Sequence, residues 1–139
     1  MLSLNPYLNF DGNCADAMHF YERALDAKLE MIMRYSETPT AMQNTPGGDR
    51  IAHARLVIDG NVLMACDAMT DQPYQGMQGF TLALNYPTAA GAKRAFEALA
   101  KGGKVGAPLQ ETFWAEVWGT VVDRFGTPWM VNGGMKNPG

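Results

Sequence analysis

The chain has 139 residues, of which 47% are hydrophobic, 18% charged and 10% aromatic, and this composition excludes disordered, collagen-like and coiled-coil proteins. A chain of this length is typically one domain with a sizeable core, so we expect a single domain over residues 1–139. The formal net charge of -3 argues against nucleic acid as the main partner, because nucleic-acid-binding proteins usually carry a basic surface. The sequence also has no polybasic run that would bind an acidic membrane.

The two cysteines, Cys14 and Cys66, are too few for a disulfide framework and are typical of a reducing compartment. The first residues show no basic region followed by an apolar stretch, and no apolar run approaches the roughly 20 residues that span a bilayer. We therefore expect a cytoplasmic protein without a membrane partner.

In the first half, hydrophobic periodicity predicts a strand, a helix and three further strands. Alternation over residues 2–10 predicts a strand with Leu8 and Phe10 on one face. Asn13 is a plausible N-cap for an amphipathic helix that begins at Cys14. The later strands are expected at residues 28–35, 51–58 and 62–66, with a long loop at 36–49. Asp59-Gly60 favours a tight hairpin turn between the last two strands.

The second half repeats this plan after a polar connection at residues 69–78. A strand is predicted at 80–85, and Pro87-Thr88 opens a helix that Gly102-Gly103 ends. Further strands are expected at 105–114, 117–123 and 127–132, with Ala107-Pro108 interrupting the first of them.

The two halves also match in detail, because a strand, an Asp, a turn Gly and a second strand recur in both. Met64 and Met130 each follow their turn glycine by four residues. The sequence therefore predicts an α+β fold of two βαβββ modules, at about residues 1–68 and 78–135, with curled mixed sheets around a cavity.

Several motifs, in this order along nearly the whole chain, resemble those of a known superfamily. They are Gly12-Asn13-Cys14-Ala15-Asp16-Ala17 before Phe20-Tyr21, Ile51-Ala52-His53-Ala54 with Leu63-Met64, Gly102-Gly103-Lys104-Val105 with Pro108-Leu109, and Thr112-Phe113-Trp114 through Asp123-Arg124-Phe125-Gly126 to Trp129-Met130. The chain resembles the vicinal-oxygen-chelate superfamily, which has the glyoxalase/bleomycin-resistance fold, and within it the PhnB-like branch. The resemblance implies that two cup-shaped modules line a cavity and that the protein is a homodimer. PhnB-like proteins largely lack established activities.

Metal-dependent members of that superfamily place His or Glu on the first and last strands of each module, pointing inward. Strand parity here gives Asn5 or Tyr7, Met64, Gly79 or Thr81, and Met130 at those positions. A thioether is a poor ligand for the divalent ions used in such sites. We expect no metal site. We also expect no nucleotide-type cofactor, because the sequence has no glycine-rich strand-to-helix loop of the kind that binds one.

His53 and Arg55 share the face of their strand that is predicted to line the cavity. An imidazole beside a guanidinium could bind an anionic or carbonyl oxygen. Alternatively, both side chains could lie at the rim of the module, bonded to loop carbonyls or to a partner subunit. Trp114 could open onto the cavity or pack in a core, and the flanking Glu111 and Glu116 could serve as bases only if they point inward.

Taken together, these patterns favour metal-independent binding or sequestration of a small aromatic or weakly anionic molecule. The candidate ligand-binding residues are Tyr7, His53, Arg55, Met64, Trp114 and Met130. Two alternatives stay open: a metal-dependent or His-based lyase, isomerase or dioxygenase-type enzyme, and a non-catalytic dimeric scaffold whose cavity is filled by its own side chains.

Overall fold

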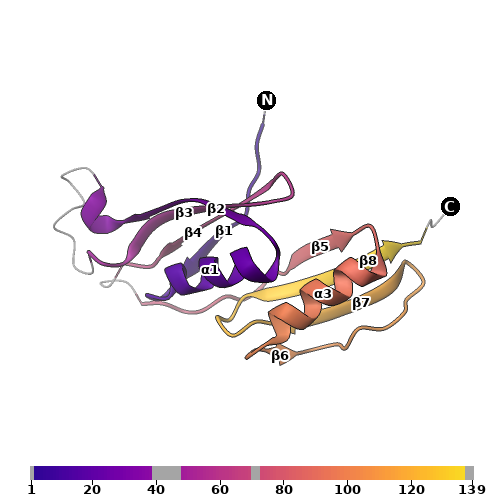
Figure 1. Cartoon of the computed structure of the whole chain (residues 1–139). Coiled ribbons are helices and arrows are strands. Elements are labelled where there is room, and N and C mark those ends of the chain that lie inside the picture. The colour runs from indigo at the N-terminus through magenta and orange to yellow at the C-terminus, as the bar shows by residue number, and fades with distance from the viewer. Residues whose placement is uncertain (1, 39–47, 70–72, 137–139) are drawn as a thin grey trace. The chain divides into compact units, whose positions relative to one another are not determined.

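The computed structural model describes residues 2–38, 48–69 and 73–136, and its chain divides into two compact units, Met1–Gly76 and Met77–Gly139 (Figure 1). Each unit contains one of the predicted βαβββ modules. The expectation that both units form a single domain stays a prediction. Among the described residues, no helix combines the length and apolar character that crossing a bilayer requires.

The first unit is a four-stranded mixed sheet with one helix on one face (Figure 1). The strand order is β1-β4-β3-β2, in which β1 and β4 are parallel and the other neighbours are antiparallel. The elements are β1 (Tyr7–Phe10), α1 (Cys14–Ala24), β2 (Lys28–Arg34), the short 3-10 helix η1 (Tyr35–Glu37), β3 (Ile51–Ile58) and β4 (Asn61–Asp67).

The second unit repeats that topology strand for strand, with the order β5-β8-β7-β6 and a parallel β5–β8 pair. Its elements are β5 (Leu82–Tyr86), α3 (Ala89–Ala100), β6 (Lys104–Val105), β7 (Ala115–Val122) and β8 (Pro128–Met135). The predicted α+β class with two βαβββ modules is therefore confirmed, and neither sheet is closed.

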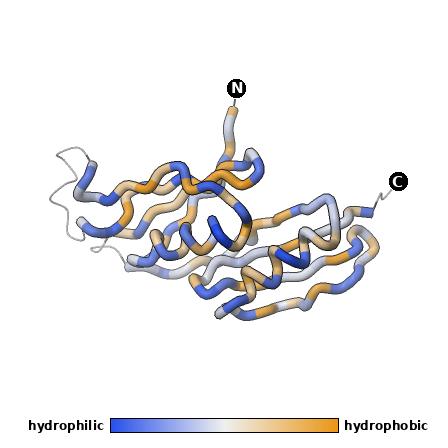
Figure 2. Tube along the Cα trace, viewed as in Figure 1, coloured by the Kyte–Doolittle hydropathy of each residue, from blue (hydrophilic) through white to orange (hydrophobic). Residues whose placement is uncertain are grey.

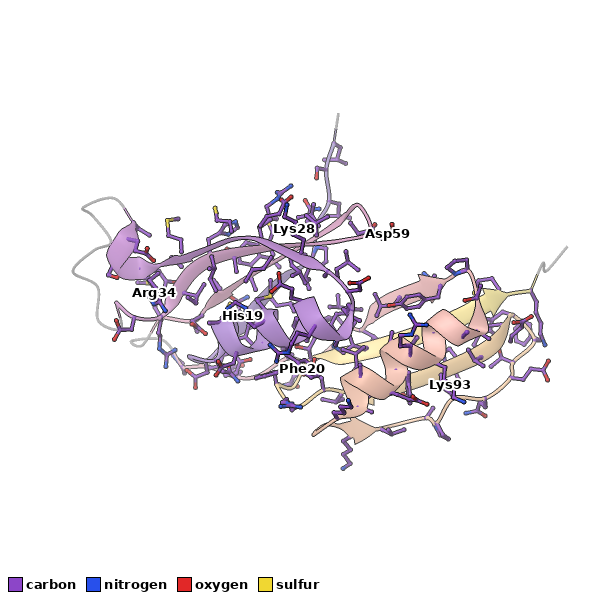
Figure 3. The ribbon with its side chains drawn as sticks, in the orientation of Figure 1. His19, Phe20, Lys28, Arg34, Asp59 and Lys93 are labelled. Atoms are coloured by element: carbon purple, nitrogen blue, oxygen red, sulfur yellow. The ribbon has the colours of Figure 1, made fainter. Side chains whose placement is uncertain are left out.

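Each helix covers its sheet because its apolar residues recur at helical spacing, and Figure 2 shows the alternation of hydrophobic and hydrophilic residues along both helices. The core of the first unit contains Phe10, Met18 and Tyr21, and that of the second contains Phe96 and Trp129. Figure 3 labels side chains that help to locate the elements. They are His19 and Phe20 on α1, Lys28 and Arg34 at the ends of β2, Asp59 at the β3–β4 turn and Lys93 on α3.

Local turn chemistry accounts for two of the predicted boundaries. Asp59 and Gly60 have φ values of 46° and 82°, as a primed hairpin turn requires, and they join β3 to β4. Thr88 caps α3, since its Oγ1 accepts a hydrogen bond of 3.1 Å from the backbone N of Gly91.

Two strands differ from their predicted bounds. The first strand covers only Tyr7–Phe10 rather than residues 2–10, and Leu2 and Leu4 are exposed. The strand expected at 105–114 is reduced to Lys104–Val105, because Pro108 lacks an N–H; an isolated bridge from Gln110 to Trp118 follows. Asn13 stands at the N-cap position of α1, but its side chain makes no capping hydrogen bond. Residues 39–47 of the predicted 36–49 loop lie outside the described residues.

Candidate functional site

One face of the first sheet packs on α1, and the opposite face, which we call the open face of the first unit, carries four of the six candidate ligand-binding residues. Tyr7 on β1 and Arg55 on β3 both pair with Met64 on the central strand β4, so these three side chains form one row across the sheet. His53 lies two residues before Arg55 on the same face of β3. The sequence-predicted residues of this unit are therefore neighbours.

Tyr7 and His53 are joined across β4 by a hydrogen bond of 3.0 Å between Tyr7 Oη and His53 Nδ1. Their ring centroids are 5.8 Å apart, with the ring planes tilted by 35°. Burial, and then the neighbouring Cys66, raise the pKa of Tyr7 to about 12. The phenol therefore keeps its proton throughout the physiological range and can serve as a hydrogen-bond donor.

Arg55 is held by an ion pair with Glu30, in which Nε donates to Glu30 Oε1 at 3.1 Å. Both side chains are about two-fifths exposed, so the pair contributes little to stability. Met31 pairs with Arg55 and Met33 pairs with His53 across the β2–β3 ladder. Figure 3 shows sulfur-bearing side chains above these strands, on the side away from α1. The polar groups of the open face are thus bordered by thioethers.

Cys66 and Asn9 complete the open face beside Tyr7. The Cys66 thiol donates to Asn9 Oδ1 at 3.2 Å. Burial raises the pKa of Cys66, so the sulfur is held as a protonated thiol rather than as a nucleophilic thiolate.

The remaining two candidates, Trp114 and Met130, lie in the second unit. Met130 is on β8, paired with Ala83 and Thr120 on the face of the sheet opposite α3. Trp114 reaches the same face, where its Nε1 donates to Asn132 Oδ1 at 3.0 Å. Asn132 Nδ2 in turn donates to Asn85 Oδ1 at 3.0 Å, which extends the hydrogen-bond chain to β5.

Trp114 belongs to an aromatic cluster with Phe113 and Trp118, at centroid distances of 4.8 and 5.8 Å. Within the part of the chain that the structure describes, Trp118 Nε1 is shielded from solvent and has no hydrogen-bond partner. Trp129 lies on the opposite, helix-covered face and belongs to the core.

The two glutamates that flank Trp114 are exposed, so they do not meet the condition of pointing inward under which they could serve as bases. Glu111 is 72% exposed and accepts a hydrogen bond of 2.6 Å from Lys136 Nζ, which lowers the pKa of its carboxyl. Glu116 is exposed as well. Lys136 also donates to the carbonyl of Thr112 at 2.8 Å and so fastens the loop that carries Trp114.

Comparison with known proteins identifies the fold family. The family sequence model of the Glyoxalase/Bleomycin resistance protein/Dioxygenase superfamily matches residues 3–131 of this chain. The chain belongs to this superfamily. It is 41% identical to Protein YjdN of Escherichia coli (strain K12), over 94% of this chain and 95% of that protein.

Two solved structures have a similar fold. The crystal structure of protein PA1353 from Pseudomonas aeruginosa has a TM-score of 0.88 at 42% identity, covering 95% of this chain and 97% of that one. A PhnB protein from Bacillus cereus, described as a 3-demethylubiquinone-9 3-methyltransferase, has a TM-score of 0.77 at 23% identity, covering 94% and 98%. At that identity the likeness shows the fold alone.

The positions that bind metal in metal-dependent members of the superfamily do not fit a divalent ion here. The positions that the resemblance implies, which are Asn5 or Tyr7, Met64, Gly79 or Thr81, and Met130, offer an amide or phenol, two thioethers and a glycine or hydroxyl instead of imidazole or carboxylate ligands. Across residues 2–38, 48–69 and 73–136, no three His, Cys, Asp or Glu side chains gather as a metal site would require.

Sequence reasoning did not include Met31, Met33, Asn85 and Asn132 among the candidates. Strand parity placed Asn9 on the face of Tyr7, opposite Leu8 and Phe10, but Asn9 was not among the candidate ligand-binding residues either. Met31 and Met33 depend on the β2–β3 register, which contains two irregularities and so could not be read from the sequence.

Proposed function

We propose that this protein is a PhnB-like member of its superfamily that binds a small molecule without a metal ion. The candidate ligand-binding residues are Tyr7, His53, Arg55 and Met64 for the first unit, and Trp114 and Met130 for the second unit. The observation that carries the proposal is the 3.0 Å Tyr7–His53 hydrogen bond beside Met64 and Arg55. A few oriented polar groups among apolar and aromatic side chains are typical of small-molecule sites.

The experiment is a ligand-observed NMR screen of aromatic and weakly anionic compounds, followed by titration of the hits into three variants. Met64→Glu places a charge among the side chains of the first unit and Met130→Glu among those of the second, and each is expected to weaken binding at its own unit at least about tenfold. Lys93→Ala, on the exposed side of α3, is the matched control and should bind like the wild type. A screen without hits, or hits that Met64→Glu and Met130→Glu leave unchanged, contradicts the proposal.

Metal content provides a separate check on metal independence. Protein purified without chelators from metal-replete growth should contain less than about a tenth of an equivalent of any transition metal. Near-stoichiometric metal that is lost in His53→Ala would favour the metal-dependent enzyme instead.

A His-based enzyme is the second candidate, and the same Tyr7–His53 hydrogen bond is the observation that favours it. An imidazole oriented by a hydrogen bond to one nitrogen can move a proton with the other. In that case His53→Ala would abolish turnover of a screened substrate while the protein stays folded. Retained turnover in His53→Ala would remove this candidate.

Assembly as a homodimer is a further part of the proposal. Several large apolar side chains are exposed on the isolated chain, among them Leu2, Leu4 and Phe113. Light scattering coupled to size-exclusion chromatography should give twice the monomer mass of 15.2 kDa. A mass that stays at the monomer value at micromolar concentration would contradict it.

A further inference from the structure

The hydrogen bonds on the open face of the first unit leave several of its donors without a partner among the described residues. Asn9 Oδ1 accepts from the Cys66 thiol, whereas the amide Nδ2 of Asn9 has no partner among the described residues. Arg55 uses Nε for Glu30, and its other guanidinium N–H groups have no partner within the described chain.

His53 is the group whose role depends on its tautomer. A phenol is a stronger acid than a neutral imidazole N–H, so the favoured arrangement has Tyr7 O–H donating to Nδ1 of His53. Because Nδ1 then accepts, the proton of the neutral ring is on Nε2. Nε2 makes no hydrogen bond to a described residue, so Nε2–H is a further donor without a partner in the described chain.

These donors lie close together on the sheet. His53 and Arg55 are two residues apart on one face of β3, which corresponds to roughly 7 Å along the strand. Lys28 pairs with Val57, which shares a face of β3 with His53 and Arg55, so a second cation lies near Arg55 and Glu30. The neighbouring Met31, Met33 and Met64 supply adaptable apolar contact.

We propose that the open face of the first unit binds small organic carboxylates, with the carboxylate on Arg55 and on Nε2–H of His53 and the apolar body on the methionines. This inference rests on the proposed small-molecule function and names its ligand class. Tyr7 acts as a positioning residue, because its hydroxyl holds His53 in the Nε2–H tautomer. Glu30 limits affinity, since it shares the guanidinium with the ligand and repels its charge.

The test uses pairs of probes that differ in charge but hardly in shape: benzoate with benzamide, phenylacetate with phenylacetamide, and hexanoate with hexanamide. Each is titrated into the full chain labelled with 15N, and backbone amide shifts of β1, β3 and β4 are followed. The acids are expected to bind at least about tenfold more tightly than their amides, as charge-assisted hydrogen bonds would give.

Variants assign that preference to individual residues. Arg55→Gln should remove the preference for acids, and Arg55→Lys should retain part of it, because Lys keeps the charge but loses the planar fork. Glu30→Gln should tighten the acids about threefold and leave the amides unchanged. Lys93→Ala, on the exposed side of α3, is the control.

The tautomer has its own readout in the 15N shifts of the two His53 ring nitrogens. Neutral His53 should be protonated at Nε2 in the wild type and become a mixture of tautomers in Tyr7→Phe. Neutral His53 protonated at Nδ1 in the wild type would overturn the inference.

The remaining outcomes separate this inference from the proposed function. Equal binding of acids and amides overturns the ligand class but leaves small-molecule binding in place. A preference for acids that survives both Arg55→Gln and His53→Gln places the carboxylate elsewhere and overturns the site. Binding of neither member of any pair contradicts both proposals.

Discussion

Asp67 Oδ1 accepts a hydrogen bond of 2.9 Å from the backbone N of Cys14, so the last residue of β4 caps the first turn of α1. The same oxygen accepts from the backbone N of Gly12 at 2.8 Å, and Oδ2 accepts from that of Ile51 at 2.8 Å. Asp67 is only 1% exposed. One buried carboxylate thus connects β4, the start of α1 and the start of β3, and it takes the role that the sequence suggests for Asn13.

Asp67→Ala should destabilise the protein by about 3–5 kcal/mol, because it leaves the buried N–H groups of Cys14 and Ile51 and the part-buried N–H of Gly12 without an acceptor. The free energy of unfolding measured with urea gives the value. Asp16→Ala, which removes an exposed carboxylate from the same turn of α1, is the control and should cost less than about 1 kcal/mol. Equal losses in the two variants would show that Asp67 does not have this role.

Two tryptophans provide a matched pair in the second unit. Trp129 Nε1 donates to Asp123 Oδ2 at 2.8 Å within the core, whereas Trp118 Nε1 has no partner among the described residues. Trp129→Phe should therefore cost about 2–4 kcal/mol, since it creates a cavity and removes a hydrogen bond to a buried carboxylate. Trp118→Phe removes an unsatisfied donor and should cost distinctly less in the same denaturation experiment. The reverse order would contradict the assignment of these two side chains.

The conformation of the β3–β4 turn predicts that substitutions at two adjacent positions, Asp59 and Gly60, change the stability of the protein to different extents. Gly60 has a φ of 82°, so Gly60→Ala strains the backbone and should lower the midpoint of thermal unfolding, at a cost of about 1–2 kcal/mol. Asp59, with a φ of 46°, can be replaced by Asn, which tolerates the left-handed region, and Asp59→Asn should be nearly neutral. A neutral Gly60→Ala would exclude the primed turn.

The protein should lose stability at alkaline pH. Burial, and then the charge of Asp67, raise the pKa of Cys14, so the folded state keeps this thiol protonated when the unfolded chain ionises it. The folded state then binds more protons than the unfolded state, and the free energy of unfolding falls as pH rises above about 8.5, by up to roughly 1.4 kcal/mol per pH unit for this group.

Cys14→Ala removes this titration and should flatten the decline in unfolding free energy between pH 8.5 and 10. Cys66 contributes to the same decline, because its pKa is raised as well, and Tyr7, with a pKa of about 12, adds to it only above about pH 10. Urea denaturation at a series of pH values measures the slopes. Identical slopes in the wild type and Cys14→Ala would contradict the prediction.

Local patterns in the sequence were sufficient for most of the elements. The alternation of Tyr7, Leu8, Asn9 and Phe10 assigns the two faces of β1, and the same period applies to His53 and Arg55 on β3. Asp59-Gly60 and Thr88 locate a turn and a helix start, because their side chains or backbones favour these conformations on their own. The duplicated βαβββ plan follows from these elements in order.

Contacts between residues far apart in the chain could not be predicted in the same way. Asp67 caps α1 from 53 residues away, and Tyr7 meets His53 across β4 from 46 residues away. The methionines of β2 join the open face only because of irregular pairing with β3.

The sequence by itself determined the class of fold, the two modules and the strand faces on which Tyr7, His53, Arg55, Met64 and Met130 lie. Those properties depend on periods of two and 3.6 residues and on turn chemistry, which act between near neighbours. Only the tertiary structure decided which side chains face one another, which carboxylate caps α1 and which nitrogen of His53 meets the phenol of Tyr7. These depend on strand register, because a shift of one residue moves every side chain of a strand to the other face.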